Sequence, residues 1–372
     1  MPVARILFPM PLPEPFDYLI PEGMTVEPGS YVRAPLGKYE RTGVVWDVVE
    51  ADPDRELKLV ADVFPTPPMP ESMRRFIAFC ARYNVAGPGQ VLGMALRARG
   101  GLSPSPTQTV YALTGHRTNR MTAAREKVLD AAAKIGSASA SDLAKEAGVS
   151  SSVVKGLVET GSLKAEIRET DLPFATPDPE RAGPTLTSEQ AQAGKRLRNA
   201  VKAGGYQPFL LDGITGSGKT EVYFEAISET LRKDPTAQVL ILLPEIALTQ
   251  AVFERFETRF GAGPAPWHSS LSDQQRRWTW RETAHGRARI VPGARSALFL
   301  PYSNLKLIIV DEEHDSSFKQ EDGVRYHARD MAVMRAKLEQ ATVILASATP
   351  ALETVVNAEA GRYERLKLSA RP

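Results

Sequence analysis

The chain has 372 residues, of which 42% are apolar and 24% charged, and its formal net charge is +2. These are the values of an ordinary globular protein with room for two or three domains, and so mild a charge identifies no partner. No apolar stretch approaches the roughly 20 residues of a membrane span, and the first residues lack a signal-peptide core, so we expect a cytoplasmic protein. The single cysteine, Cys80, excludes a disulfide and a cysteine-based zinc site, and its apolar neighbours predict a buried core residue.

Residues 1–105 are predicted to form a small β-rich domain, because short β-type runs alternate with glycine and proline turns. A helix is expected over 71–83. Strands are expected over 6–8, 16–20, 31–34, 41–46 and around 58–64.

Residues 106–177 are predicted to form a winged helix. Ser141 is the expected N-cap of the second helix, and Gly148 makes the turn after it. A β wing is expected over 161–167. Such a unit binds DNA, and a spacer or a protein-contact module is the alternative. The three helices are expected over 124–134, 141–147 and 150–157, between linkers at 101–107 and 173–184.

Residues 183–372 contain solidly apolar runs that suit strands buried on both faces of a parallel sheet. Helical patterns between these runs complete βαβ units, so the whole chain is predicted to be a multidomain α/β protein. The strands are expected at 209–211, 239–243, 307–310 and 343–346.

The segment GITGSGKT at 213–220 matches the pattern G-x-x-x-x-G-K-[ST] and lies between a predicted strand and a helix over 221–233. Glycines let backbone N–H groups curl around phosphates. Lys219 places a positive charge beside the β- and γ-phosphates, and Thr220 offers its hydroxyl to Mg²⁺. A glycine-rich turn with an incidental lysine is the alternative. The pattern predicts a P-loop lobe of the RecA-like class. ATP and Mg²⁺ are expected at Gly213, Gly216, Ser217, Gly218, Lys219 and Thr220.

A second motif follows the strand at 307–310, where Asp311 and Glu312 lie at the carboxyl end, the place at which open α/β sheets bind ligands. Asp311 is expected to hold Mg²⁺ through coordinated water. Glu312 is placed to orient or deprotonate the attacking water. With Lys219, these are the predicted catalytic residues.

Further positions are expected to connect the nucleotide with the rest of the lobe. Ser347 and Thr349 follow another apolar strand and are expected to couple nucleotide state to neighbouring loops. His314 is expected to bridge the ATP site to the segment that comes after it. Gln190, upstream of the first strand, carries an amide that can pair with an adenine edge.

The segment 318–327 mixes aromatic residues, cations and a glycine, so it is predicted to sense single-stranded DNA by stacking. An ordinary surface loop is the alternative. Arg295 is expected to contact either a phosphate or only an internal carboxylate. The expected DNA contacts in the segment are Phe318, Lys319, Arg325 and Tyr326.

Together, the motifs at 213–220, 311–314 and 347–349 resemble the front half of a superfamily 2 helicase. Further strings make the chain similar to the bacterial replication restart helicases of the primosome. These strings are LPEIALT at 243–249, GARSA at 293–297, FKQ at 318–320, RYHARD at 325–330, PEPFDY at 13–18 and PLGK at 35–38.

The resemblance implies that residues 1–105 bind the 3′ end of a nascent strand through Phe16, Asp17, Gly37 and Lys58. Phe16 can stack on the terminal base, Asp17 can accept from a 3′-hydroxyl, Gly37 permits close backbone approach and Lys58 can meet a phosphate. The family's winged helix and first motor lobe would then match residues 105–177 and 183–372.

The family continues into a second motor lobe with arginine fingers and carries a cysteine-rich zinc-binding insertion. This sequence stops at 369–372 with one cysteine, so we expect both to be absent and the zinc ligands to be missing. It is a fragment or a reduced homologue, and we expect it to bind ATP but to turn it over very slowly.

The function expected from the resemblance is an ATP-dependent DNA helicase and restart factor, associated with the nucleoid. Its implied partners are forked and single-stranded DNA, single-strand-binding protein and other primosome proteins, with no membrane. One alternative is an ATP-binding module that recognises DNA structure without unwinding it. A more distant one is a P-loop ATPase that acts on proteins.

Replacing the P-loop lysine tests the nucleotide assignment. Lys219→Ala should abolish nucleotide-dependent behaviour, starting with weaker ATP binding, while leaving the fold and DNA binding largely intact, because it removes the charge that meets the phosphates. Titration with a fluorescent ATP analogue measures the effect. Wild-type affinity in the variant would refute the role of Lys219.

Overall fold

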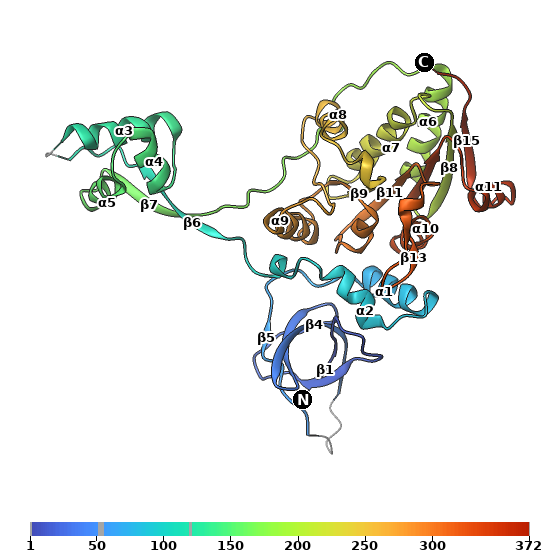
Figure 1. The fold of residues 1–372 in the computed structure, drawn as a ribbon, viewed down its shortest axis with the longest axis horizontal. Coiled ribbons are helices and arrows are strands. Elements are labelled where there is room, and N and C mark those ends of the chain that lie inside the picture. Colours follow the sequence, from blue (N-terminus) through green and yellow to red (C-terminus); the bar gives the residue numbers. More distant parts are fainter. Residues whose placement is uncertain (1, 51–55, 119–120, 372) are drawn as a thin grey trace. The chain divides into compact units, whose positions relative to one another are not determined.

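The computed structural model describes residues 2–50, 56–118 and 121–371 (Figure 1). Two compact units are present: residues 1–103 together with 173–372, and residues 104–172. The β-rich and α/β parts therefore belong to one unit, and the predicted three-domain division remains a prediction. Within the described ranges, no helix has both the length and the apolar character needed to cross a membrane.

The first part of the larger unit is a five-stranded antiparallel sheet with strand order β2-β1-β4-β3-β5, which confirms the predicted β-rich fold. A bridge from Leu19 to Leu59 brings the chain before β5 back to β2. Because 58–60 are used in this bridge, the strand expected over 58–64 shrinks to β5. The elements are β1 Pro2–Leu7, β2 Phe16–Leu19, β3 Tyr31–Leu36, β4 Tyr39–Glu50, β5 Asp62–Val63, α1 Glu71–Tyr83, α2 Pro88–Ala95 and the 3₁₀ turn η1 Arg99–Leu102.

The smaller unit packs three helices against a two-stranded antiparallel sheet, β6 and β7. The second helix starts earlier than predicted: its N-cap is Ser139, not Ser141, because the Ser139 hydroxyl accepts the Asp142 N–H at 3.1 Å. Its DNA-binding role as a winged helix remains a prediction. The elements are β6 Thr107–Leu113, α3 Ala123–Ile135, α4 Ala140–Ala147, α5 Ser151–Glu159 and β7 Leu163–Glu169.

The rest of the larger unit is a six-stranded parallel sheet with strand order β10-β9-β11-β14-β8-β15, as predicted for the lobe. Parallel pairing gathers the carboxyl ends of all strands at one edge. The elements are α6 Ser188–Ala203, β8 Gln207–Gly213, α7 Lys219–Lys233, β9 Gln238–Leu242, η2 Glu245–Ala247, α8 Gln250–Phe260, α9 Asp273–Ala284, β10 Ile290–Gly293, η3 Arg295–Phe299, β11 Leu305–Asp311, η4 Ser316–Phe318, β12 Lys319–Gln320, β13 Tyr326–His327, α10 Ala328–Glu339, β14 Thr342–Ser347, α11 Leu352–Glu359 and β15 Glu364–Leu368.

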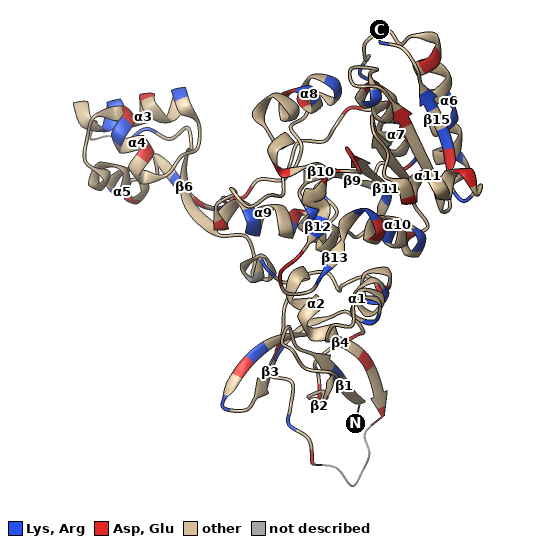
Figure 2. Ribbon diagram, turned by 45° about the vertical axis from the view of Figure 1, so that its right-hand side comes forward, with Lys and Arg blue, Asp and Glu red and all other residues tan. Residues whose placement is uncertain are grey.

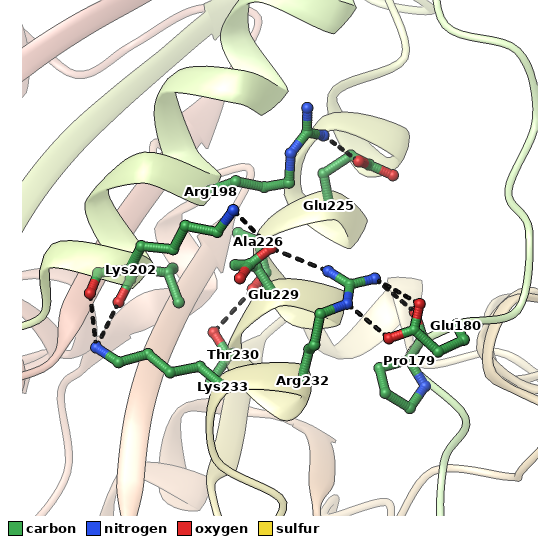
Figure 3. Close-up of polar contacts among 11 residues, drawn as sticks. Pro179, Glu180, Arg198, Lys202, Glu225, Ala226, Glu229, Thr230, Arg232 and Lys233 are labelled. Carbon is green, nitrogen blue, oxygen red and sulfur yellow. Dashed lines mark hydrogen bonds and ion pairs between the residues drawn. The ribbon is translucent and has the colours of Figure 1, made fainter.

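Ion pairs hold the P-loop helix α7 in place (Figure 3). The almost fully buried carboxylate of Glu229 lies 2.9 Å from Arg232 and 3.8 Å from Lys202 of α6. Arg232 also pairs with Glu180 of the preceding linker at 2.6 Å. Lys233 donates to the carbonyls of Val201 and Lys202 at the end of α6, at 3.0 and 2.9 Å. These contacts attach the C-terminal part of α7 to the end of α6.

An apolar core joins the first part of the larger unit to the lobe. Trp280 of α9 is 1% exposed, lies edge-on to Tyr31 at 5.7 Å and donates its indole N–H to the Ala95 carbonyl at 2.8 Å. Cys80 is buried in the same core, as predicted, against Met331 of α10 at 3.3 Å. Side chains from α1, α2, α9 and α10 therefore pack as one body.

Truncating Trp280 tests this core. Trp280→Ala should lower the free energy of unfolding by about 3–5 kcal/mol, because it leaves a large cavity and an unpaired buried carbonyl. Urea denaturation followed by circular dichroism measures the loss. The control is Trp278→Ala on the same helix, whose ring is only half-buried and stacks on Phe174 at 4.1 Å; it should lose about 1 kcal/mol. Equal losses would contradict the packing described here.

Candidate functional site

The P-loop connects β8 to α7 at the carboxyl edge of the sheet. Gly216 and Gly218 have φ of 81° and 79°, a left-handed conformation that side chains disfavour. The Ser217 N–H donates to Ile214 O at 3.0 Å and closes the turn. The Ser217 hydroxyl is buried and has no hydrogen-bond partner in the described part of the chain. The loop thus offers an unused donor beside a helix N-terminus, which fits a bound phosphate.

Lys219 is 8% exposed and bridges the loop to the second motif. Its Nζ donates to Gly213 O at 3.0 Å and lies 3.7 Å from Glu312 Oε1. Thr220 follows Lys219 on the first turn of α7. The predicted lysine therefore lies close to a carboxylate of the second motif, and the predicted Thr220 is the next residue along the helix.

Asp311 and Glu312 lie at the end of β11, as expected for the second motif. Burial, and next the neighbouring Glu312 charge, raise the pKa of Asp311 from 3.8 to about 6. Its Oδ2 accepts from the Tyr223 hydroxyl at 3.1 Å. Glu312 has a φ of 50°, an uncommon conformation for a residue with a side chain, and such strain clusters at functional sites. A divalent cation would offset the repulsion of these two carboxylates, so the donor set fits Mg²⁺.

Sequence reasoning missed Tyr223. It follows Lys219 by four residues on α7 and therefore shares its helix face. This four-residue spacing could have identified Tyr223 in the sequence.

Gln190 supports the loop rather than presenting a free amide. Its Nε2 donates to Ser217 O at 2.8 Å, and its Oε1 accepts the Thr187 N–H at 2.9 Å in the capping box of α6. The side chain is 4% exposed. A Cβ on Gly218 would lie 2.2 Å from Gln190 Nε2, so the two pack tightly. These contacts occupy one N–H donor and the oxygen acceptor of the Gln190 amide. Pairing of the amide with adenine remains a prediction.

The predicted coupling residues lie together. His314 Nδ1 is 2.7 Å from Ser347 Oγ, which also accepts the Thr349 N–H at 3.0 Å. His314 is 3.7 Å from Glu312 Oε2. It thus links the acidic motif to the end of β14, whereas its expected bridge to segment 318–327 remains a prediction.

Glu313, to which no role was assigned, is the most buried carboxylate of the motif, with 0% exposure. It accepts from the Ala351 N–H at 2.7 Å and the Thr354 hydroxyl at 3.0 Å, and it pairs with Arg329 at 3.4 Å. Arg329 lies in the first turn of α10, directly after β13. The carboxylate therefore ties the acidic motif to the segment after β14 and to the hairpin of β12 and β13. In the sequence, the presence of a third acidic residue directly after Asp311 and Glu312 could have indicated this role.

A cavity of about 300 Å³ lies beside this hairpin and is rich in basic side chains. Arg295 lines it and donates to the carbonyls of Ser317 and Lys319 at 2.9 and 2.7 Å. The expected internal carboxylate partner of Arg295 is therefore wrong, because backbone carbonyls take that place. Contact with a phosphate remains a prediction. The other lining residues are Arg97, Leu243, Glu245, Trp267, His268, Ser269, Arg276, Ala294, Ser296, Ser317, Phe318 and Gln320.

Two of the residues expected to stack on bases are core residues. Phe318 is 1% and Tyr326 5% exposed, and Tyr326 lies edge-on to Phe299 at 5.4 Å. A buried ring offers no face to a base, so the stacking expectation is wrong for these two. Lys319 and Arg325 are exposed, and Lys319 is 3.3 Å from Glu321. Their contact with DNA remains a prediction.

The residues expected at a 3′ end gather around β2. Phe16 is 40% exposed at the start of β2. The Tyr18 hydroxyl donates to Pro35 O at 2.9 Å, which ties the turn at Gly37 to this strand. The Leu19 N–H donates to Lys58 O at 2.9 Å and places Lys58 beside it.

Asp17 carries a partner that sequence reasoning missed. Arg5 of β1, its register neighbour, lies 3.5 Å from its carboxylate. The side chain of Asp17 keeps 19% exposure and that of Arg5 51%. Arg5 is visible in the sequence, but only strand pairing brings it to Asp17.

Comparison with known proteins finds two family matches and several similar relatives. Residues 5–97 match the 3′DNA-binding domain (3′BD) family, and residues 187–358 match the DEAD/DEAH box helicase family. The replication restart protein PriA of Haemophilus influenzae is 36% identical over 392 aligned positions, which cover 100% of this chain and 52% of that protein. PriA of Rickettsia felis is 32% identical and covers 99% of this chain and 46% of its own length. PriA of Bacillus subtilis is 42% identical over 238 positions, 62% of this chain and 29% of that protein. The Haemophilus and Rickettsia alignments cover nearly all of this chain but only about half the length of those relatives.

Removing the Glu313 charge tests its structural role. Glu313→Gln should lower the free energy of unfolding by about 3 kcal/mol, because it leaves the largely buried Arg329 without this carboxylate. The matched control is Glu312→Gln, the adjacent acid with a side chain 39% exposed, which should change stability little. Urea denaturation of both variants measures the difference. If the two behaved alike, Glu313 would not be the hub of the motif.

Proposed function

We propose that this chain, which matches the amino-terminal portion of the PriA family of replication restart proteins, carries the ATP-binding and DNA-fork-binding parts of an ATP-dependent DNA helicase. The observation that carries the proposal is the meeting of Lys219, Asp311 and Glu312 at one edge of a parallel sheet in a chain whose first domain matches a 3′-end DNA binder.

The nucleotide half rests on the P-loop geometry. Lys219 and the loop N–H groups would hold the phosphates, and Thr220 and Asp311 would hold Mg²⁺. Bound Mg²⁺ supplies positive charge at the phosphates. Glu312 is partly exposed beside Lys219 and is placed to orient or deprotonate water.

The DNA half rests on two regions of this chain. The first is the end of the β domain around Phe16, Asp17, Gly37 and Lys58, which would receive the 3′ end of a nascent strand. The second is the basic cavity beside Arg295, which would contact the sugar-phosphate backbone of single-stranded DNA. Recognition of a stalled or abandoned fork, single-strand-binding protein and primosome assembly belong to the same proposal through the match to PriA.

ATP turnover separates this proposal from its alternatives. This chain is expected to turn ATP over very slowly, so even a small rise of hydrolysis with single-stranded DNA that is lost in Glu312→Gln supports a helicase motor. DNA binding without stimulated turnover supports a module that recognises DNA structure. If the chain binds no DNA and its rate of ATP hydrolysis does not change when DNA is added, an ATPase that acts on proteins is supported.

The end of the β domain should distinguish DNA termini. We expect about tenfold tighter binding to DNA with a 3′-hydroxyl than to the same strand with a 3′-phosphate. The hydroxyl can donate a charge-assisted bond to Asp17, whereas a phosphate adds a second anion. Fluorescence-anisotropy titration of the full chain measures the ratio. Equal affinities would sink the end-binding proposal.

Three variants assign that preference to its residues. Phe16→Ala and Asp17→Ala should erase it while leaving residual electrostatic binding. Arg5→Gln should enlarge it, because the guanidinium 3.5 Å from Asp17 is a cation that a 3′-phosphate can use. A smaller preference in the Arg5 variant would place the terminus away from this pair.

A further inference from the structure

The hairpin of β3 and β4 ends in an exposed aromatic residue held in a fixed place. Tyr39 is 68% exposed and pairs directly with Leu36 across the turn. Only Gly37 and Lys38 separate the two strands, and Gly37 has a φ of 63°. Glycine in this conformation at the first turn position is typical of a tight two-residue hairpin, which holds the flanking residues rigidly.

Arg41 completes a pair with this ring. Its guanidinium lies 5.3 Å from the centroid of the Tyr39 ring, within the range of a cation–π interaction. Side chains alternate along a strand, so Tyr39 and Arg41 share a face and Glu40 lies on the other, where it is 3.9 Å from Arg33. No carboxylate pairs with Arg41 in the part of the chain that the structure describes. Figure 2 shows both blue and red segments near the free end of this hairpin.

The pair adjoins the pocket proposed for the 3′ end. Tyr39 follows Gly37 by two residues, so their Cα atoms are at most about 7 Å apart. The hydrogen bond from Tyr18 to Pro35 O ties the turn to β2, which carries Phe16 and Asp17. A strand that leaves the pocket along the hairpin therefore passes the ring.

We propose that Tyr39 and Arg41 form a second DNA-binding site, on which an internal base near the 3′ end stacks while its phosphate pairs with Arg41. The site rests on the proposed function, since it takes its position from the 3′-end pocket. Arg41 is a cation without a competing carboxylate, and the aromatic ring accepts any base, so the site takes single-stranded DNA without regard to sequence. A lone exposed tyrosine needs no such role, but one paired with a free arginine beside a strand terminus matches the chemistry of a single-strand binder.

Removal of single bases tests the stacking. The full chain is titrated with 5′-labelled oligonucleotides that carry one abasic site at each of the last five positions in turn. Tyr39→Ala should bind the intact strand about fivefold or more weakly, and Tyr39→Phe, which keeps the ring, should bind as the wild type does. One internal abasic position should weaken the wild type to the same degree and remove its advantage over Tyr39→Ala.

Salt dependence tests Arg41 separately. Arg41→Gln should reduce the slope of log affinity against log salt by roughly one phosphate contact, about 0.7 for single strands, whereas Tyr39→Phe should leave the slope unchanged. An unchanged slope in Arg41→Gln would remove the phosphate contact from the proposal.

The design distinguishes failure of this site from failure of the pocket. Full wild-type affinity in Tyr39→Ala, or an equal effect of that change on every abasic strand, overturns the stacking site. The end pocket alone is overturned by a different result: DNA with a 3′-hydroxyl and DNA with a 3′-phosphate bind equally, but one internal abasic position still removes the effect of Tyr39→Ala. The stacking site then stands. Unfolding midpoints of the variants should equal that of the wild type, because both side chains are exposed.

Discussion

The arrangement of the lobe depends on one buried carboxylate. Glu313 has no exposed surface, and burial of an unpaired charge would cost several kcal/mol. Its donors come from three places: Arg329 after the β12–β13 hairpin, the Ala351 N–H after β14 and the Thr354 hydroxyl of α11. Any movement of one segment that breaks these bonds leaves the charge unsatisfied. The acidic motif, the segment after β14 and the hairpin are therefore constrained to one arrangement, or to a small set of them.

The two acids before Glu313 in the motif have different environments. Asp311 is buried at the strand end with a raised pKa, held by the Tyr223 hydroxyl. Glu312 turns out of the strand through a strained backbone conformation and faces Lys219. Two adjacent carboxylates thus have separate surroundings, one suited to a metal ion and the other to a water molecule.

Hydrogen bonds to the backbone hold Arg295, one of the proposed DNA contacts, in place. Arg295 donates to two carbonyls at the base of the hairpin, and the hairpin leads directly into the helix that supplies Arg329. A continuous series of contacts therefore runs from the basic cavity to the nucleotide motifs. In the β domain, Arg5 lies 3.5 Å from Asp17, so the proposed terminal pocket contains an ion pair with part of each group exposed.

The sequence by itself determined the helix over Glu71–Tyr83, the parallel strands of the lobe and the nucleotide motifs, because periodicity and a strand–loop–helix order are local properties. Motif spacing also placed Lys219, Asp311 and Glu312 at one sheet edge. Tertiary structure alone decided which side chains are covered. Phe318 and Tyr326 look available in a loop but are buried, and Glu313 looks solvated but is enclosed. Pairs such as Arg5 with Asp17 arise from strand register between residues far apart in the chain, which no local pattern records.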